Sequence, residues 1–573
     1  MPDQSQTSPS AFVCEGGLIK SRSTFIMQPG QALELLNFEP DIEGGYRRIN
    51  GFRKHCNHIV PQTSSSSEKV LMVAFFNNNI VAARGEKIFS SASTELATAI
   101  TSSATMSGSG TITVDSTTGF SSSGTLQIDS EIFTYTGVTS TTFTGVTRAT
   151  SSTTAAAHVV DSAVSESWTE RDTGRTNAGK YTFERFNFDG NEKIIVTDGT
   201  NDPTVFNTSF SATDVTESTV EGAKFVTAFK SHMFYAGMSS TPQTLVFSQP
   251  FDEDAFNSGS GAGSIKVDDT IVGMKAFRGD LFVFCENRIF KLTGSSSSDF
   301  AITPVTRNIG CVNGDTIQEF AGDLIFLGPD GLRTVAGTAR IGDVELGTIS
   351  ANVQSIFDEN LVDAALFESV VIPDKTQYRI FFSKDEQSED NTRGVICVMK
   401  GQNFEFAELR GIKPSATDTF VEAGNVLVLH GGYDGFIHRQ EKGNDFDGTK
   451  VSGRYRSPDL TFGDPGIRKH MQRVIVNYKP ESAINADMFV RYDYEDRYSS
   501  RPAAYPLDSE DVVAIYGTST YGTPTYGGAS QPLLRQSVEG SGFAVALRVN
   551  DNATTAPYSL KGFQLEYQLG ARR

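Results

Sequence analysis

One motif occurs twice in this chain, at a distance that strongly limits the possible fold. The segment AFRGDLFVFCENRIFKLTG at 276–294 aligns without a gap with EFAGDLIFLGPDGLRTVAG at 319–337. Phe277 and Phe320 occupy matching positions 43 residues apart, and Phe229 in a related segment lies 48 residues before Phe277. Four short antiparallel strands need roughly 40–50 residues, the length of one propeller blade. The repeat therefore favours a β-propeller over a series of unrelated hairpins in a sandwich.

Each copy of the motif has the pattern of a β-hairpin. Residues 281–285 form an apolar run rich in aromatic and β-branched side chains, 286–287 supply a turn, and 288–292 return with apolar and polar residues alternating. Looser copies of this hairpin occur at 75–90, 188–206, 228–237 and 422–440. Few helices are expected. Apolar residues recur at helical spacing in 349–371, where we expect one or two short helices beside a blade.

The composition agrees with a β-rich globular protein. The 573 residues are 38% hydrophobic and 20% charged, and the 53 glycines suit short strands joined by tight turns. No apolar run approaches the roughly 18–20 residues of a membrane-spanning helix, and the N-terminus lacks the pattern of a signal peptide. Five scattered cysteines without CxxC pairing are typical of free, buried thiols. We therefore expect no membrane span and synthesis in a cytoplasm.

Two segments interrupt the repeat and divide the chain into parts. The first is rich in Ser, Thr, Ala and Gly but contains strand-like alternation, which predicts a small β module inserted into a propeller loop. The second has longer alternating strands and predicts a β-sandwich-like domain. The predicted all-β chain thus has an N-terminal arm or docking segment (1–50), a first propeller part (51–90), the inserted module (91–165), the main propeller (166–450) and the C-terminal β domain (451–573).

Candidate catalytic and metal-binding patterns are sparse. His55, Cys56 and His58 provide three potential ligands within four residues, but a zinc site normally uses two separated pairs, and no second pair follows. Glycosidases on propellers need two facing carboxylates and aromatic platforms, whereas this chain has a single tryptophan, Trp168, and no sialidase-type box. We find no phosphate-binding loop, nucleophile elbow or dinucleotide motif. The sequence predicts neither an enzyme nor a bound cofactor or metal.

Two basic clusters stand out because the formal net charge is −19. Both lie in short segments, 46–55 and 462–473, and both are candidates for contact with an acidic partner or with DNA phosphates. Ordinary salt bridges at solvated strand ends would explain them equally well. The candidate contact residues are Arg47, Arg48, Arg53, Lys54, Arg468, Lys469 and Arg473.

Several segments together resemble structural proteins of tailed bacteriophage virions. They are NFEPDIEGGYRRINGF near the start, the repeated F-x-G-D-L blades, the module GTLQIDSEIFTYTGVTSTTFTGVTRA and the closing YSLKGFQLEYQLGARR. The family that this arrangement resembles is the tail nozzle, or tail tubular protein B, of short-tailed phages. The DNA-stabilising tail hubs share its layout, and these residues do not separate a nozzle from a hub.

The resemblance implies a mechanical role in the virion. Six copies would form a ring below the portal and below the adaptor, which is also called the connector. This ring would contact tail fibres or spikes, and it would enclose the channel through which double-stranded DNA leaves. An acidic subunit suits that role, since it repels DNA and lets the duplex slide without sequence-specific binding. The alternative is a propeller-based tail protein that binds a host receptor or degrades host polysaccharide.

Overall fold

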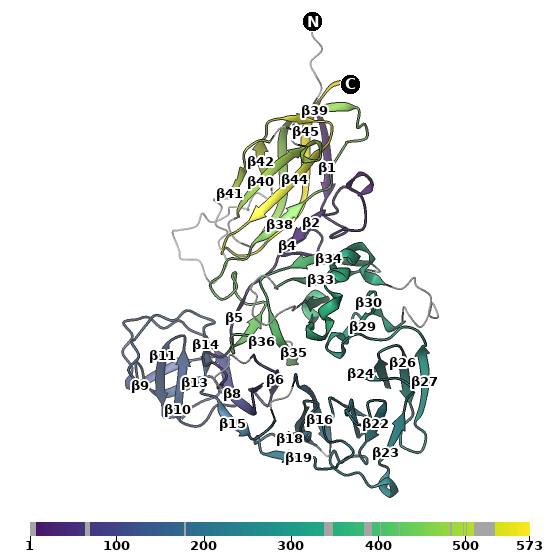
Figure 1. The fold of residues 1–573 in the computed structure, drawn as a ribbon. Helices are drawn as coiled ribbons and strands as arrows, with labels where there is room; N and C mark the ends of the chain where they lie inside the picture. Colours follow the sequence, from purple (N-terminus) through teal and green to yellow (C-terminus); the bar gives the residue numbers. More distant parts are fainter. Residues whose placement is uncertain are drawn as a thin grey trace.

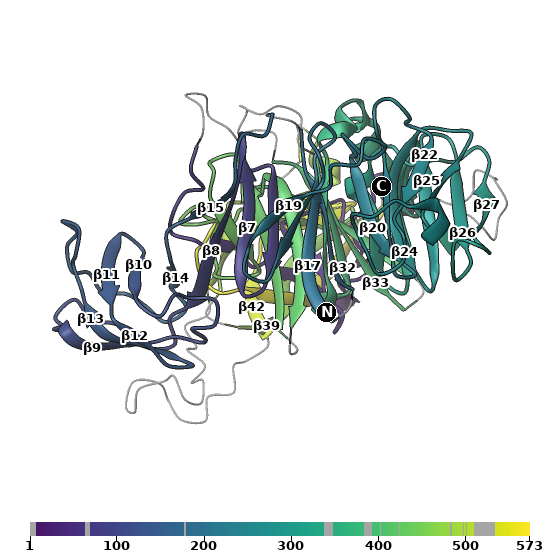
Figure 2. The ribbon, with the colours of Figure 1, turned by 90° about the horizontal axis from the view of Figure 1, so that it is seen from below.

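The computed structural model confirms the predicted all-β fold. It describes residues 7–62, 69–176, 179–188, 190–336, 348–382, 392–401, 403–422, 425–481, 484–496, 498–499, 501–508 and 533–572. A ring of small antiparallel sheets forms a β-propeller, a β-sandwich stands on its rim, and a small β module extends from its side (Figures 1 and 2).

Five of the propeller sheets stand alone in the described part of the chain, with three or four strands each. The first three are β16–β19 (Thr182–Phe188, Asn191–Thr197, Thr204–Asn207, Ala212–Asp214), β20–β23 (Phe225–Phe229, His232–Ala236, Thr244–Phe247, Gly263–Lys266) and β24–β27 (Ile271–Phe277, Asp280–Cys285, Ile289–Thr293, Ala301–Thr306). The other two are β28–β30 (Gln318–Phe320, Asp323–Gly328, Gly331–Thr334) and β35–β37 (Pro414–Glu422, Asn425–Gly432, Ile437–Gln440) with β5 (Phe52–Lys54).

Two further four-stranded units complete the ring as parts of larger sheets. They are β6, β7, β8 and β15 (Met72–Phe76, Asn79–Arg84, Lys87–Glu95, Thr169–Asp172) and β31–β34 (Glu368–Ile372, Gln377–Phe381, Gly394–Lys400, Asn403–Leu409). The first strands of successive units contact one another around the axis: β6, β16, β20, β24, the 3-10 turn η3 (Gly314–Thr316) that precedes β28, then β31, β35 and again β6. The ring therefore closes on itself.

The repeated motif begins at the turn between the first and second strands of a blade and continues through the second and third strands. In four blades, two residues with positive φ join these strands: Asn77 and Asn78, Lys230 and Ser231, Arg278 and Gly279, and Ala321 and Gly322. Two left-handed residues are what a two-residue type I′ hairpin requires, and this turn has the twist of the flanking strands. The recurring sequence therefore marks recurring turn geometry, and the aromatic residue before it closes each first strand.

A strand from the N-terminal part of the chain completes the last blade. β5 pairs with β37 through Phe52, Arg53 and Lys54, so this sheet contains strands from both ends of the propeller sequence. Near the axis, the carboxylate of Asp418 on β35 accepts a hydrogen bond from the Phe75 amide on β6 at 2.9 Å and pairs with the Arg185 guanidinium on β16. The Nε of Arg185 also donates to the Phe75 carbonyl at 2.7 Å. One buried carboxylate thus connects three blades where the ring closes.

The inserted module continues the sheet of the first blade. Its strands are β9 (Ser107–Thr113), β10 (Gly124–Ile128), β11 (Glu131–Tyr135), β12 (Gly137–Val138), β13 (Thr142–Thr147) and β14 (Ala163–Ser165). β14 pairs with both β10 and the end of the blade strand β8, so module and blade form one ten-stranded sheet. The module nevertheless has its own apolar core, which includes Leu126, Phe133 and Phe143.

The N-terminal segment, which we expected to be an arm, lies in the sandwich together with the C-terminal strands. One layer, the terminal sheet, contains seven strands: β1 (Thr7–Val13), β3 (Phe38–Pro40), β4 (Tyr46–Arg48), β39 (Ile467–Pro480), β42 (Leu533–Ser537), β43 (Ser541–Gly542) and β45 (Tyr558–Arg572). β1 pairs with β45 from Thr7 to Val13, and β4 pairs with the beginning of β45. Residues 7–50 are thus integrated into the β domain.

The other layer joins the sandwich to the propeller. It contains β2 (Glu34–Leu36), β38 (Gly453–Arg456), β40 (Asn485–Tyr492), β41 (Tyr505–Asp508) and β44 (Val545–Asp551), and through β2 it is continuous with the blade β31–β34. β2 runs parallel to β34 at Leu36 and Glu408 and antiparallel to β38. We call this nine-stranded layer the shared sheet. One apolar core spans the junction and includes Phe38, Tyr378 and Leu565.

The segment predicted to contain short helices forms three helical turns beside the blade β28–β30. They are η4 (Ile349–Val353), α2 (Gln354–Asp358) and η5 (Leu361–Leu366). Val353, Ile356 and Phe357 are buried in the large core, so these turns serve packing.

The ends of the inserted module meet at the blade. Leu96 donates its amide to the Ser162 carbonyl at 2.9 Å, and Glu95 pairs with Ala163. Replacing residues 98–161 by a short Gly-Ser linker should therefore leave β8 and β14 in place, because closing such a loop costs little. We expect a soluble protein with nearly native circular dichroism and melting temperature. Unfolding of the whole chain would instead show that the ring depends on these residues.

The contact of three blades at Asp418 should be a major source of ring stability. Asp418→Ala leaves the Phe75 amide without its acceptor and the Arg185 guanidinium without its carboxylate partner, so the free energy of unfolding should fall by about 2–4 kcal/mol. Asp268→Ala is the matched control, since it removes only a solvent-exposed pair with Arg288 and should cost less than about 0.5 kcal/mol. Equal losses in urea-unfolding measurements would contradict a special role for Asp418.

Candidate functional site

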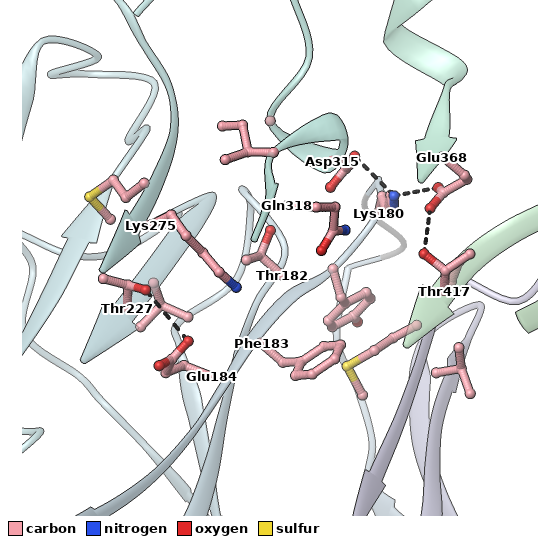
Figure 3. A pocket seen from close by; sticks show the side chains of 18 residues that line it. Lys180, Thr182, Phe183, Glu184, Thr227, Lys275, Asp315, Gln318, Glu368 and Thr417 are labelled. Carbon is pink, nitrogen blue, oxygen red and sulfur yellow. Dashed lines mark hydrogen bonds and ion pairs between the residues drawn. The ribbon is translucent and has the colours of Figure 1, made fainter. Parts of the chain in front are cut away.

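The first strands of the blades surround a polar cavity on the propeller axis. It has a volume of about 150 Å³, and residues from all seven units line it, among them Val73, Thr182, Thr227, Lys275 and Gln318 (Figure 3). A second cavity of about 690 Å³ adjoins it and shares Lys180, Asp315 and Glu368. Segments that connect successive blades, including Lys224, Thr270 and Val312, line this wider space. It is therefore the mouth of the axial cavity.

Three charged side chains meet where the two cavities join. Lys180 precedes β16, Asp315 lies in η3, and Glu368 begins β31, so three separate blades supply them. The Lys180 ammonium lies 2.9 Å from the Asp315 carboxylate and also pairs with Glu368. Thr417 on β35 donates to Glu368 at 3.5 Å (Figure 3). Ring closure thus brings together residues that are far apart in the sequence.

Burial and charge set the protonation of this cluster. Burial raises the pKa of Glu368 to about 8; Lys180 opposes this rise and the nearby Asp315 carboxylate adds to it. Burial opposes the charge on Lys180, but Asp315 and Glu368 together raise the pKa of its ammonium, which stays protonated. Burial, together with the presence of one ammonium for two carboxyl groups, therefore favours the protonated form of Glu368 near neutral pH. A protonated, ion-paired lysine is no nucleophile.

A second polar group lies deeper along the axis. Thr227 donates to Glu184 at 3.4 Å, and the Lys275 side chain extends toward the same carboxylate (Figure 3). Burial raises the pKa of Glu184, and Lys275 and the Ala228 amide oppose this rise. These residues connect β16, β20 and β24. The axis is therefore filled by polar contacts between blades.

Sequence reasoning missed this axial cluster. Lys180, Asp315 and Glu368 belong to no local motif, and each is a single charged residue in or next to the first strand or turn of a blade. The available signal was their position. The first strand of each repeat unit lies nearest the axis when the repeats close into a ring, so polar residues there are candidates to face the axis.

The first basic cluster is divided between the two domains. Arg47 lies in the sandwich and pairs with Glu39 at 3.0 Å and Glu481 at 2.6 Å, whereas Arg53 and Lys54 lie in β5 of the propeller. Arg53 pairs with Asp445 at 3.2 Å, and Lys54 pairs with Asp447 at 3.6 Å and lies over the Phe436 ring. The segment therefore forms no single basic surface.

Two of the residues predicted to contact DNA or a partner are buried in the sandwich. Arg48 is fully buried, pairs with Asp551 at 3.4 Å and donates to the Ala553 carbonyl at 2.8 Å. Lys469 is also buried and donates to the Phe543 carbonyl at 3.0 Å, and burial lowers the pKa of its ammonium. Each side chain points into the sandwich because its strand position faces inward, which composition alone did not show. Neither can contact DNA or another protein.

The other two members of the second cluster lie at the surface of the sandwich. Arg468 stacks on the Phe543 ring with its guanidinium carbon 4.7 Å from the ring centre, and it donates to Ser541 at 3.2 Å. Arg473 is about half exposed and pairs with Glu566 on the neighbouring strand at 3.4 Å. Both cations thus have partners within the chain.

Other reactive groups are arranged for packing. The five thiols are free and buried, and burial raises the pKa of Cys14, Cys56, Cys285 and Cys311 to about 12. Within the residues that the structure describes, no group of three or more His, Cys, Asp and Glu side chains could hold a metal ion. Over the same residues, no helix is both long and apolar enough to cross a membrane.

Comparison with known proteins gives only distant structural similarity. No protein-family model and no curated protein sequence matches the chain. Among solved structures, it is similar to Hsv2 of Kluyveromyces lactis (TM-score 0.28, 8% identity, covering 60% of this chain and 98% of that one). It is also similar to Raptor of Chaetomium thermophilum (TM-score 0.30, 8% identity, 63% and 29%) and to PorZ, a surface component of the type-IX secretion system of Porphyromonas gingivalis (TM-score 0.27, 10% identity, 68% and 44%).

The protonation of Glu368 should make stability depend on pH. Its folded pKa of about 8 lies above its ordinary value of 4.5, so the stability from its protonated form is complete below pH 4.5 and is lost as pH rises toward 8. Glu368→Gln cannot lose this proton. As the pH rises from 5 to 8, the free energy of unfolding of the variant should therefore increase relative to that of the wild type, by up to about 1.4 kcal/mol per pH unit.

Urea unfolding at several pH values would measure this difference. Glu286→Gln is the control, because that side chain is exposed at the rim of the same cavity. A Glu368→Gln curve that runs parallel to wild type over this pH range would show that Glu368 is ionised in the folded protein.

Proposed function

We propose that this chain is a structural subunit of a bacteriophage tail that assembles as a ring, in the manner of a tail nozzle or tail hub. In this proposal six copies surround the channel for DNA ejection, contact the adaptor and dock tail fibres or spikes in the virion. The role is mechanical, and no reaction is assigned to the chain.

The observation that carries this proposal is the shared sheet. Nine strands run without a break from a propeller blade into the sandwich, and one apolar core continues across the junction. Two domains joined only by a flexible linker would move independently, whereas hydrogen-bonded strands and a common core resist bending. A continuous rigid body suits a subunit that must bear load between the adaptor and the tail tip.

The axial cavity supports a channel between copies rather than through one copy. A volume of 150 Å³ corresponds to about five water molecules, and polar contacts between blades cross it. It is far too small for a DNA duplex. DNA would therefore pass through the opening of an assembled ring, where the net charge of −19 per copy favours sliding over adsorption.

Electron microscopy of the purified protein and of virions tests the proposal. We expect a six-fold ring on the tail axis, with the inserted modules at its periphery. A protein that stays monomeric and hydrolyses host surface polysaccharide, with activity lost on substituting a carboxylate pair, would contradict it and favour the receptor-binding or polysaccharide-degrading alternative.

A further inference from the structure

The outer face of the shared sheet carries a group of arginines in an otherwise acidic protein. Along β38, β40 and β44, inward-facing residues such as Tyr455, Val490 and Leu547 are buried, and the alternate positions face away from the sandwich core. Four of these outward positions are arginines, which we call the arginine face: Arg454, Arg456, Arg491 and Arg548.

Two members of the arginine face are directly opposite each other. Arg456 on β38 is the cross-strand partner of Arg548 on β44. Like charges in this position destabilise a sheet, because the side chains are held about 5 Å apart at their Cβ atoms. Burial is the main cause that lowers the pKa of Arg548, and Arg454 and Arg456 add to it while Glu34 opposes it. The fold therefore bears an electrostatic cost at this place.

Among the residues that the structure describes, the carboxylates that pair with the arginine face are too few to neutralise it. Glu34 lies 3.7 Å from Arg454, 4.0 Å from Arg456 and 3.7 Å from Arg548, all longer than a good hydrogen bond. Glu495 pairs with Arg456 at 3.4 Å and Arg491 at 3.1 Å. Over the described part of the chain, four guanidinium groups thus share two carboxylates, Glu34 and Glu495. Asp487 is a further acid at an outward position of β40. Arg454 and Arg548 are the least engaged of the four.

One guanidinium group of the arginine face, that of Arg491, is held in place by an aromatic ring. Arg491 lies over the Phe489 ring, with its guanidinium carbon 4.8 Å from the ring centre, and Phe489 is the cross-strand partner of Arg548. Stacked guanidinium groups lose little entropy on binding, and their planar donors match carboxylates in two-point contacts. The arginine face is therefore suited to binding carboxylates.

We propose that the arginine face binds carboxylates on the surface of a second copy of this chain. The proposal rests on the proposed ring function and identifies one of its subunit contacts. Sixty-eight acidic residues against 49 basic ones make any neighbouring copy rich in carboxylates, and copies with this net charge need a local complementary patch to associate. DNA is disfavoured as the occupant because the same net charge repels a polyanion.

The test compares self-association and stability of one double variant. Arg454→Gln with Arg548→Gln removes two positive charges but keeps polar side chains of similar length. Mass photometry over a concentration series should show association weakened at least tenfold, while the melting temperature stays equal or rises because the like-charge repulsion is relieved. Lys230→Gln with Lys266→Gln removes two exposed charges from the propeller and should change neither quantity.

The outcomes separate this inference from the function on which it rests. A wild-type protein that stays monomeric at every concentration contradicts both. If the wild type forms rings and the Arg454→Gln, Arg548→Gln variant associates with the same dissociation constant, the arginine face is not a subunit contact. The proposed ring function is then unaffected. Binding of a duplex DNA probe that the wild type shows and this variant loses would assign the face to nucleic acid, and would also overturn the inference.

Discussion

The architecture depends on where residues 34–54 form their hydrogen bonds. β2 is the only strand in the described part of the chain that connects the blade β31–β34 to the sandwich strands, through its parallel contact at Leu36 and its antiparallel pairing with β38. After the sandwich strands β3 and β4, β5 completes the last propeller blade against β37. A short stretch of chain thus joins the two domains and closes the ring. The remaining blades can form locally, but these two strand pairings require long-range loop closure.

The positions of the charged side chains follow from the ring and from the shared sheet. On the axis, the ammonium of Lys180, the carboxylate of Asp315 and the carboxyl group of Glu368 are supplied by separate blades and meet only in the closed ring. Where β35 meets β6, Asp418 performs the same task with Arg185. On the outer face of the shared sheet the balance is incomplete, because Arg456 and Arg548 are opposite each other and share Glu34. The paired interior charges join separate blades, whereas the arginine face is the surface at which we propose that a second copy binds.

The sequence predicted the features that have local signals. The blades that contain the Phe277 and Phe320 repeats could be predicted because their turns repeat in the sequence. Each type I′ turn needs two residues that adopt positive φ, here Arg278-Gly279 and Ala321-Gly322. The module at 91–165 was predicted from its alternation, and it lies in the connection between the blade strands β8 and β15. The sequence did not reveal that β14 joins the module to the sheet of that blade. Strand pairing of residues 7–50 with β45 left no local signal, because short strands separated by more than 500 residues share no pattern.

The candidate site was predictable only in part, for the same reason. Arg47 and Arg48 are adjacent in sequence, yet one is partly exposed and paired with Glu481, and the other is buried against Asp551. Their difference follows from the alternation of a strand whose register the sequence did not reveal. The axial residues Lys180 and Glu368 meet only through ring closure, and the arginine face requires the order of β38 and β44 in the sheet.

Hydrogen exchange followed by mass spectrometry, at increasing urea concentrations, tests most directly whether propeller and sandwich are one rigid body. Peptides from β36 in the closing blade and β44 in the sandwich should lose protection at the same urea concentration, because β2 and the common core join them into one cooperative unit. The inserted module, with its separate core, is free to open earlier. Loss of protection in β44 well below the midpoint for β36 would show that the sandwich unfolds independently, and would contradict the account.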